Sequence, residues 1–429
     1  MDIIEIINKK RYSGKLSEDE IQFFVDGVCS GKIKDYQTTS LLMAICINNL
    51  DFDEIYYLTK AMANSGEVLN LDDVGVCLDK HSTGGVSDTT TLIVVPTLAS
   101  LGVKVAKMSG RSLGWTGGTA DKLEVFAGYQ TEISTDEFKN NIKQNGASII
   151  SQSEDFALAD KIIYKLRSDS ATVDNLGLIA SSIMSKKIAC GAKILILDVK
   201  YGSGAFMKTL DDAKQLATVM VELGKKFGIK TSAIISCMDQ PLTAFVGNNL
   251  EVYSAIKTLC GEENDLLELS AFICAKALLF EGKCKTLDEG IMLAKTEIAS
   301  GSAKQKLKKI VSAQGGSVEA IDNPEILLPQ NNSFDVICDQ DGFVTDMDTT
   351  KIGYTAHDLQ KQNGVLKRQD DVGAILNKKI GDPVKKGEKL LTFFYNNIDN
   401  VEEIAKKFKS AFVIGNFVKS VNLIEEIVE

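Results

Sequence analysis

Two loops rich in glycine and hydroxyl side chains constrain the fold of this chain more than any other feature. The first covers residues 79–86 and reads Asp-Lys-His-Ser-Thr-Gly-Gly-Val, and the second covers residues 109–124 and contains four glycines. Apolar runs typical of strands precede them, at residues 74–78 and 103–108, and helix-like runs follow. This alternation predicts a parallel α/β sheet, whose ligands bind beyond the carboxyl ends of the strands.

The pattern changes along the chain in a way that indicates separate parts. Residues 1–68 have apolar stripes of helical period, and one helix there begins at a capping box formed by Ser17 and Glu20. Further strands of the sheet are expected at residues 193–199 and 231–237, preceded by a helical insert at residues 160–190. Beyond Pro324, strand-like runs at residues 333–337 and 342–347 predict a small α/β or β-rich C-terminal part.

Composition narrows the class of protein. The net charge is −10 over 429 residues, without long runs of like charge, which argues against nucleic acid or an anionic membrane as the main partner. The nine cysteines form no C-x-x-C pair, which favours buried thiols in a reducing cytosol over a metal or redox site. No apolar run approaches the ~18 residues of a spanning helix. We therefore expect a cytoplasmic protein with no metal, no nucleic acid and no membrane as partner.

The two loops have the composition of an anion site. Backbone N–H groups at a helix start and hydroxyl side chains suit phosphate, and a lysine supplies the opposing charge. For any single Ser or Thr the simpler interpretation is a helix cap, but two such loops with lysines favour anion binding. The candidate phosphate ligands are Lys80, Ser82, Thr91, Lys107, Ser109 and Thr119.

A second cluster lies in the helical insert. Ser182 and Lys186 are four residues apart, hence on one face of a helix, and with Arg167 they could bind a planar ligand that carries carbonyl oxygens. The alternative is that these are solvated surface charges.

The chain has only two histidines, His81 and His357, which argues against a His-rich metal site and against a Ser-His-Asp triad. A G-x-x-x-x-G-K-[ST] loop is absent from the sequence, which argues against an ordinary NTPase.

Together these segments resemble the thymidine phosphorylase / pyrimidine-nucleoside phosphorylase family over nearly the whole length. The matching runs are residues 23–27, 35–37, 80–86, 109–124, 164–167, 171–174, 185–187 and 202–208. The resemblance implies reversible phosphorolysis of pyrimidine nucleosides (uridine, thymidine, deoxyuridine) to free base and (deoxy)ribose 1-phosphate. Inorganic phosphate is then the co-substrate, and the protein is a homodimer.

The resemblance also implies an α/β architecture with the active site in an interdomain cleft. A small all-helical domain would comprise residues 1–68 and 159–190. A large mixed α/β domain would comprise residues 69–158 and 191–330, followed by a C-terminal α/β subdomain at residues 331–429.

Residue roles follow from the same resemblance. Phosphate would lie on the α/β side, against the six residues named above. The catalytic residues would be His81, Arg167 and Lys186. The pyrimidine would be bound from the helical side by Tyr164, Arg167, Ser182 and Lys186, with Leu113, Val173, Ile179 and Phe206 lining its pocket.

Several positions depart from the family pattern. Ser112 and Trp115 stand where Gly and His are usual, and Ser168-Asp169-Ser170 replaces Asp-Val-Thr. Some members bind a monovalent cation near the first loop and the run 241–254, where this chain has Ser87 and Ser254 in place of Gly and Glu.

These departures leave three alternatives open. One is a phosphorylase of the same fold with a different nucleoside. Another is a phosphoribosyltransferase, although an acidic pair for magnesium is not evident in the sequence. The third is a non-catalytic paralogue that binds nucleosides or phosphate.

Overall fold

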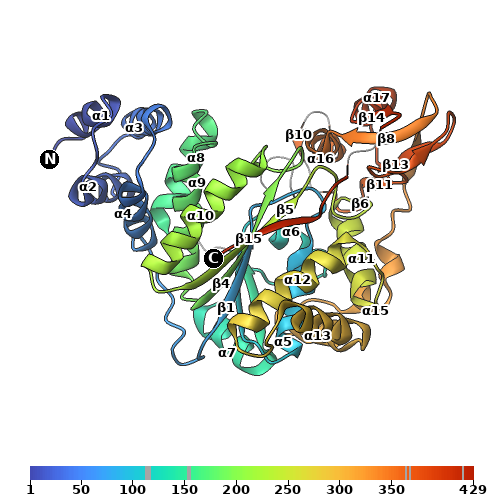
Figure 1. The fold of residues 1–429 in the computed structure, drawn as a ribbon, viewed down its shortest axis with the longest axis horizontal. Coiled ribbons are helices and arrows are strands. Elements are labelled where there is room, and N and C mark those ends of the chain that lie inside the picture. The colour runs from blue at the N-terminus through green and yellow to red at the C-terminus, as the bar shows by residue number, and fades with distance from the viewer. Residues whose placement is uncertain (112–116, 152–155, 363–364, 367–368, 418–419) are drawn as a thin grey trace.

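The computed structural model describes residues 1–429 apart from 112–116, 152–155, 363–364, 367–368 and 418–419. Figure 1 shows a bundle of helices, a large sheet covered by helices, and a smaller β-rich part. The chain begins in the bundle and ends beside the large sheet. Leu113, Ser112 and Trp115, singled out in the sequence, lie outside the described residues.

The helical bundle joins two stretches that are distant in the sequence. The predicted capping box is confirmed, since Ser17 and Glu20 bond each other's backbone at the start of the second helix. The bundle core combines Phe24 and Leu41 with Ile163 from the insert, so the insert packs on the N-terminal helices. The helices are α1 (Ile3–Arg11), α2 (Glu18–Cys29), α3 (Asp35–Asn48), α4 (Phe52–Ala63), α8 (Leu158–Asp169) and α9 (Leu176–Ala189).

The large sheet has six strands in the order β15-β5-β4-β1-β2-β3. Neighbours from β5 to β3 run parallel, whereas β15 pairs antiparallel with β5. The C-terminal segment thus returns to complete the edge of this sheet, which the sequence analysis did not predict. The strands are β1 (Leu78–Ser82), β2 (Val105–Ser109), β3 (Ala147–Ser151), β4 (Ile194–Tyr201), β5 (Lys230–Cys237) and β15 (Ile424–Val428).

The predicted position of the first strand is wrong: the strand lies about one strand length further along the chain than residues 74–78. The apolar run 74–78 precedes the strand, and β1 itself contains the polar residues Asp79, Lys80, His81 and Ser82. These side chains occupy a central strand because buried ionic partners on neighbouring elements compensate their charges. The strands predicted at 103–108, 193–199 and 231–237 are confirmed within a few residues as β2, β4 and β5.

Helices cover both faces of the sheet. On one face α5 and α12 pack on the sheet, and α11 and α14 pack on α5; all four share one core with Leu78, Ile196 and Ile234. On the other face α9 and α10 pack on Leu195 and Leu197. Consecutive residues of β4 therefore point into the hydrophobic cores on opposite faces of the sheet. The remaining helices of this part are α5 (Thr90–Ser100), α6 (Thr119–Leu123), α7 (Thr135–Asn145), α10 (Leu210–Lys226), α11 (Asn248–Leu259), α12 (Asp265–Phe280), α13 (Leu287–Ala299), α14 (Ser302–Ala313), α15 (Glu319–Asp322) and the 3-10 turn η1 (Pro324–Leu327).

The described residues of the C-terminal part form three small antiparallel sheets, of four, three and two strands, with a core around Val344, Phe393 and Phe408. The predicted strands at 333–337 and 342–347 are confirmed as β7 and β8. Its elements are β6 (Phe245–Val246), β7 (Asn332–Ile337), β8 (Gly342–Met347), α16 (Thr349–Asp358), β9 (Lys361–Gln362), β10 (Val365–Leu366), β11 (Gly373–Leu376), β12 (Pro383–Val384), β13 (Lys389–Tyr395), α17 (Val401–Lys409) and β14 (Phe412–Gly415).

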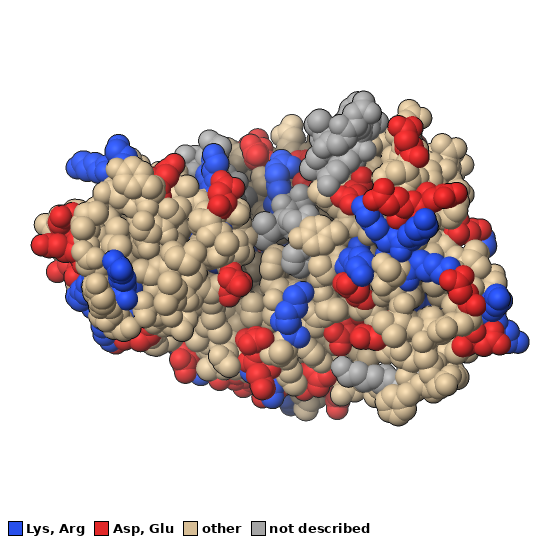
Figure 2. Space-filling view, turned by 90° about the horizontal axis from the view of Figure 1, so that it is seen from above, with Lys and Arg blue, Asp and Glu red and all other residues tan. Residues whose placement is uncertain are grey.

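The surface carries charges of both signs. Figure 2 shows basic and acidic side chains interspersed on the face viewed from above, in keeping with the moderate net charge. Within the part of the chain that the structure describes, every helix is too short or too polar to cross a membrane.

Candidate active site

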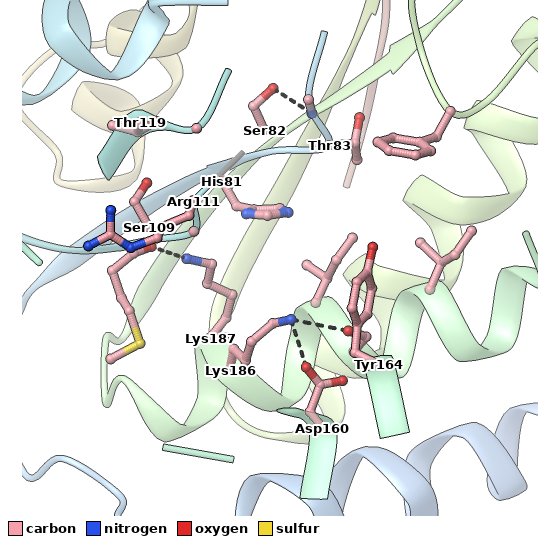
Figure 3. Close-up of a pocket in the computed structure, with 18 of the residues that line it drawn as sticks. His81, Ser82, Thr83, Ser109, Arg111, Thr119, Asp160, Tyr164, Lys186 and Lys187 are labelled. Atoms are coloured by element: carbon pink, nitrogen blue, oxygen red, sulfur yellow. Dashed lines mark hydrogen bonds and ion pairs between the residues drawn. The ribbon is translucent and has the colours of Figure 1, made fainter. Parts of the chain in front are cut away.

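A cavity of about 1000 Å³ lies between the carboxyl ends of the sheet strands and helices α8 and α9 of the bundle. The first loop, the described ends of the second loop and the segment 206–208 complete its lining. His81 lies near the middle of Figure 3, with Ser109 and Arg111 on one side of it and Tyr164 and Lys186 on the other. The cavity therefore brings together the two clusters that the sequence placed far apart.

Five of the six candidate phosphate ligands line this cavity. On the first loop, the Ser82 hydroxyl donates to Asp88 Oδ2 at 2.5 Å and accepts from the Gly84 N–H at 3.3 Å. These contacts hold the loop backbone in place at the cavity wall. The five lining residues are Ser82, Thr91, Lys107, Ser109 and Thr119.

Lys80 is placed differently from the other five. Its side chain is fully buried beneath the first loop, where its ammonium bonds the Thr90 hydroxyl and lies 3.8 Å from Asp198 Oδ2. Burial lowers the pKa of Lys80, while Asp88 and Asp198 act in the opposite direction. Lys80 is therefore the one candidate of the six that does not line the cavity in this structure.

Lys80 belongs to a buried ionic cluster that supports the first loop. Lys200 Nζ lies 2.9 Å from Asp198 and 3.8 Å from Asp88. Burial alone would raise the pKa of Asp88, but Lys200 and Lys80 hold that pKa well below its usual range. Two lysines therefore compensate two carboxylates, and we call these four residues the Asp198 cluster.

His81 faces the cavity as a neutral imidazole. Its Nε2 atom is buried and has no hydrogen-bond partner among the described residues. Burial, followed by the charges of Lys187 and Lys107, holds the pKa of His81 well below its ordinary value. Because the ring stays uncharged near neutral pH, His81 can offer a hydrogen bond to a ligand but not a preformed positive charge.

On the side of the cavity formed by α8 and α9, Lys186 is a partly buried cation in the lining. Its ammonium bonds Asp160 Oδ2 at 2.8 Å and the Ser182 hydroxyl at 3.1 Å, and it lies 5.7 Å from the centre of the Tyr164 ring. Figure 3 shows this arrangement, with Asp160 below the ammonium. Lys186 and Ser182 thus project from α9 together, as their spacing predicted.

Arg167 is 1% exposed and organises the turn between α8 and α9. Its three nitrogens donate to the carbonyl oxygens of Thr172, Leu178 and Val173 at 3.0, 3.1 and 2.6 Å. The guanidinium also faces the Tyr164 ring at 5.5 Å. The side chain therefore fixes the backbone around Val173 while it contributes positive charge to the cavity wall. The predicted apolar residues Val173, Ile179 and Phe206 also line the cavity.

Sequence reasoning missed Asp160. This carboxylate is 3% exposed, and its Oδ1 atom is buried without a hydrogen-bond partner among the described residues. A signal for it was present, because Asp160, Tyr164 and Arg167 follow the i, i+4, i+7 spacing of one helix face. Lys187, Arg111 and Thr83 also line the cavity and were not predicted.

Serine and threonine hydroxyl groups occupy the region in which some members of the family bind a monovalent cation. Ser87 adopts a left-handed backbone with φ of 61°, and its Oγ lies 2.7 Å from Thr243 Oγ1. The Ser254 hydroxyl is buried without a partner among the described residues. Glu251, one turn earlier on α11, is 2.8 Å from Lys122 and is therefore already neutralised. These residues do not fit a cation site that relies on a carboxylate from α11.

Comparison with protein families gives three matches along the chain. Residues 4–66 match the helical bundle domain of a glycosyl transferase family, and residues 75–304 match the a/b domain of that family. Residues 343–415 match the pyrimidine nucleoside phosphorylase C-terminal domain. The expected fold of a helical domain, a large α/β domain and a C-terminal domain is confirmed.

Related proteins match over the whole chain. A pyrimidine-nucleoside phosphorylase from Staphylococcus aureus strain bovine RF122 / ET3-1 is 46% identical, with 100% of both chains covered. The protein of the same name from strain MSSA476 is 45% identical, with the same coverage. Among solved structures, anthranilate phosphoribosyltransferase from Thermus thermophilus has a TM-score of 0.61 at 20% identity, covering 73% of this chain and 99% of its own, which shows a shared fold. The full-length matches, the three domain matches and the two-sided cavity establish that the chain belongs to the pyrimidine-nucleoside phosphorylase family.

Proposed function

We propose that the protein catalyses the reversible phosphorolysis of pyrimidine nucleosides, yielding free base and (deoxy)ribose 1-phosphate. One observation carries the proposal: a single cavity is lined by residues of the two Gly-rich loops on one wall and by Lys186, Ser182 and Arg167 on the other. Phosphate and a nucleoside can lie there next to each other, with the glycosidic bond between them. Uridine, thymidine and deoxyuridine are the proposed substrates.

The phosphate wall holds the nucleophile. Four hydroxyl residues and one lysine line this wall: Ser82, Thr91, Ser109, Thr119 and Lys107. Fixed donors that are already oriented hold the phosphate oxygens facing the anomeric carbon, with little reorganisation at the moment of reaction. Attack of phosphate then forms the bond from oxygen to the anomeric carbon as the bond to the base nitrogen breaks.

The base wall stabilises the leaving group. Negative charge develops on the pyrimidine as the glycosidic bond breaks, and the cations of Lys186 and Arg167 lie on the wall where we place its carbonyl oxygens. Both are largely shielded from water, which strengthens their effect on a nearby charge. His81 supplies a neutral hydrogen bond between the two walls.

The experiment that tests the function measures release of free base from uridine, thymidine, deoxyuridine and cytidine, each with and without phosphate. We expect phosphate-dependent release from the first three. Release from cytidine alone would indicate a different nucleoside specificity. No release from any of them, with the nucleosides still bound, would indicate a non-catalytic paralogue and contradict the proposal.

We propose that the reaction needs no metal, organic cofactor or monovalent cation. The direct hydroxyl contact between Ser87 and Thr243, and the pairing of Glu251 with Lys122, support this. The initial rate of base release in potassium, sodium and tetramethylammonium phosphate of equal ionic strength is expected to agree within about twofold. A rate that depends on potassium by about tenfold or more would contradict it.

We propose that the protein is a homodimer formed through the helical domain. On α3, Tyr36, Met43 and Ile47 are 70%, 39% and 71% exposed, and their spacing places them on one face. The neighbouring α1 adds the exposed Ile4, and the exposed Tyr12 follows its last residue. Exposed apolar side chains gathered on two neighbouring helices favour association, and the resemblance makes a second copy the partner.

Light scattering is expected to give twice the chain mass of 46.6 kDa for the wild type, and one chain mass for Ile47→Glu. The substitution places a charge in the proposed interface. A wild-type mass of one chain at micromolar concentration would contradict the dimer.

We also place the protein in the cytoplasm. All nine cysteines are free thiols, among them the buried Cys77, Cys190 and Cys274. Free thiols in this number are compatible with a reducing compartment.

A further inference from the structure

Two lysines share one carboxylate beneath the floor of the cavity. Lys187 Nζ on α9 lies 2.8 Å from Asp79 Oδ2, and Lys107 Nζ on β2 lies 3.9 Å from Asp79 Oδ1. Both ammonium groups also donate to the carbonyl oxygen of Met108, at 2.8 and 2.9 Å. The three side chains are at most 5% exposed. We call Asp79, Lys107 and Lys187 the Asp79 cluster.

The Asp79 cluster carries one more positive charge than it can balance. It has two lysines for one carboxylate, whereas the Asp198 cluster has two lysines for two carboxylates. A buried unbalanced charge is costly, so the group either loses its proton or acquires an anion. The anion in this case is the phosphate that we place on the adjacent Ser109.

The surroundings of Lys107 offer no other counter-charge among the described residues. From β1 it faces Asp79, the positive Lys80 and the neutral His81. From α9 it faces Lys187 and the Cys190 thiol, whose pKa burial raises to about 12, so that it stays neutral. Lys186, further along α9, is already paired with Asp160 of α8.

Within the cluster, Lys107 is the lysine that can lose its proton. Lys187 forms hydrogen bonds with both Asp79 and Met108, whereas Lys107 bonds only the carbonyl. Burial, then Lys187, lowers the pKa of Lys107 to about 7, and Asp79 offsets this only in part. A bound phosphate dianion supplies the missing negative charge and raises that pKa again.

We propose that Lys107 takes up a proton from solvent when phosphate enters the cavity, and that Lys187 causes this coupling by holding the shared Asp79 carboxylate. The proposal rests on the proposed function, because it needs phosphate at this wall. The step is an acid–base exchange: an N–H bond forms at Lys107 Nζ, the buffer acid loses that proton and keeps the electron pair, and the proton returns when the anion leaves.

Calorimetric titration with inorganic phosphate in two buffers of different ionisation enthalpy measures the protons taken up. About one pH unit above the pKa of Lys107, the free site is mostly neutral, so close to one proton per site is expected from this lysine. The ionisation of phosphate itself contributes equally to every variant, so differences between variants isolate the contribution of Lys107.

Two substitutions separate the coupling from simple loss of binding. In Lys107→Arg the guanidinium stays charged at all working pH values, so phosphate binds but proton uptake falls by close to one. In Lys187→Met, Lys107 is the only lysine of the cluster that remains beside the Asp79 carboxylate. We therefore expect Lys107 to be protonated before phosphate binds. Proton uptake on phosphate binding then falls by the same amount as in Lys107→Arg. Lys165→Met is the matched control, since this exposed lysine lines the cavity outside the cluster, and its uptake should equal the wild-type value.

The kinetic counterpart is a rise of the phosphate KM with pH. Above the pKa of Lys107 we expect the wild-type KM to rise up to about tenfold per pH unit, and the profile of Lys187→Met to be flatter. Equal proton uptake in the wild type, Lys107→Arg and Lys187→Met would overturn the inference while leaving phosphorolysis intact. Absence of both phosphate binding and phosphate-dependent base release would instead reject the proposed function and the inference with it.

Discussion

Replacing Lys186 by methionine is expected to lower kcat/KM for uridine by about 10²–10³-fold, the range measured when one preorganised donor to a developing charge is removed. Lys186 is held by Asp160 and Ser182 and is directed into the cavity, so its charge is fixed before the reaction starts. Since the pyrimidine gains its negative charge only as the glycosidic bond breaks, most of the loss should appear in kcat.

Steady-state kinetics at saturating phosphate check this result. Lys165→Met serves as the control, because it removes an exposed charge from the same cavity without touching the Asp160 contact. We expect that variant to stay within about threefold of the wild type. A Lys186→Met enzyme with unchanged kcat and a raised KM would show that Lys186 binds the ground state only.

Replacing Lys200 by methionine is expected to lower the free energy of unfolding by about 3–5 kcal/mol, the usual effect of removing one partner from a buried ion pair. Lys200 is fully buried and lies 2.9 Å from Asp198, with Asp88 at 3.8 Å. The substitution roughly preserves the volume but leaves the two carboxylates of the Asp198 cluster with Lys80 as its one remaining lysine. The first loop contains Lys80, a member of the Asp198 cluster, so we expect this loop to lose its fixed geometry as well.

Urea unfolding followed by circular dichroism measures this loss. Lys225→Met, on the exposed face of α10, is the matched control and should change stability by less than about 0.5 kcal/mol. A Lys200→Met protein as stable as the control would mean that water or protonation compensates the two carboxylates.

The sequence predicted best those features that depend on residues close together in the chain. The capping box at Ser17, the strands β4 and β5 and the helical face that carries Ser182 and Lys186 all depend on short-range rules of spacing and alternation. The two Gly-rich loops predicted where the site lies, because strand order and helix starts place such loops at one edge of a parallel sheet.

Features that depend on tertiary partners were missed or misplaced. An apolar run is the usual sign of a central strand, so β1 was predicted before Asp79, although the strand continues through Ser82. Its polar side chains are tolerated only because Lys187, Asp198 and other distant residues lie beside them. Phosphate contact by Lys80 stays a prediction; the spacing of residues did not reveal that its side chain is buried against Thr90 and Asp198.

Long-range pairing explains the remaining gaps. The strand β15 joins the edge of a sheet built almost entirely from residues 78–237, and no local signal in the sequence indicates that return. Asp160 shares a helix face with Tyr164 and Arg167, yet its importance becomes clear only when Lys186 of α9 is seen bonded to it.

In the proposed reaction, the residues around one cavity transfer a pentose from a pyrimidine base to phosphate. Phosphorus NMR of a uridine reaction, combined with absorbance of the free base, tests this most directly. We predict that inorganic phosphate disappears and a sugar 1-phosphate appears in a one-to-one ratio with uracil, and that the reaction reverses when the products are added. Base released without consumption of phosphate would indicate hydrolysis and would contradict the account.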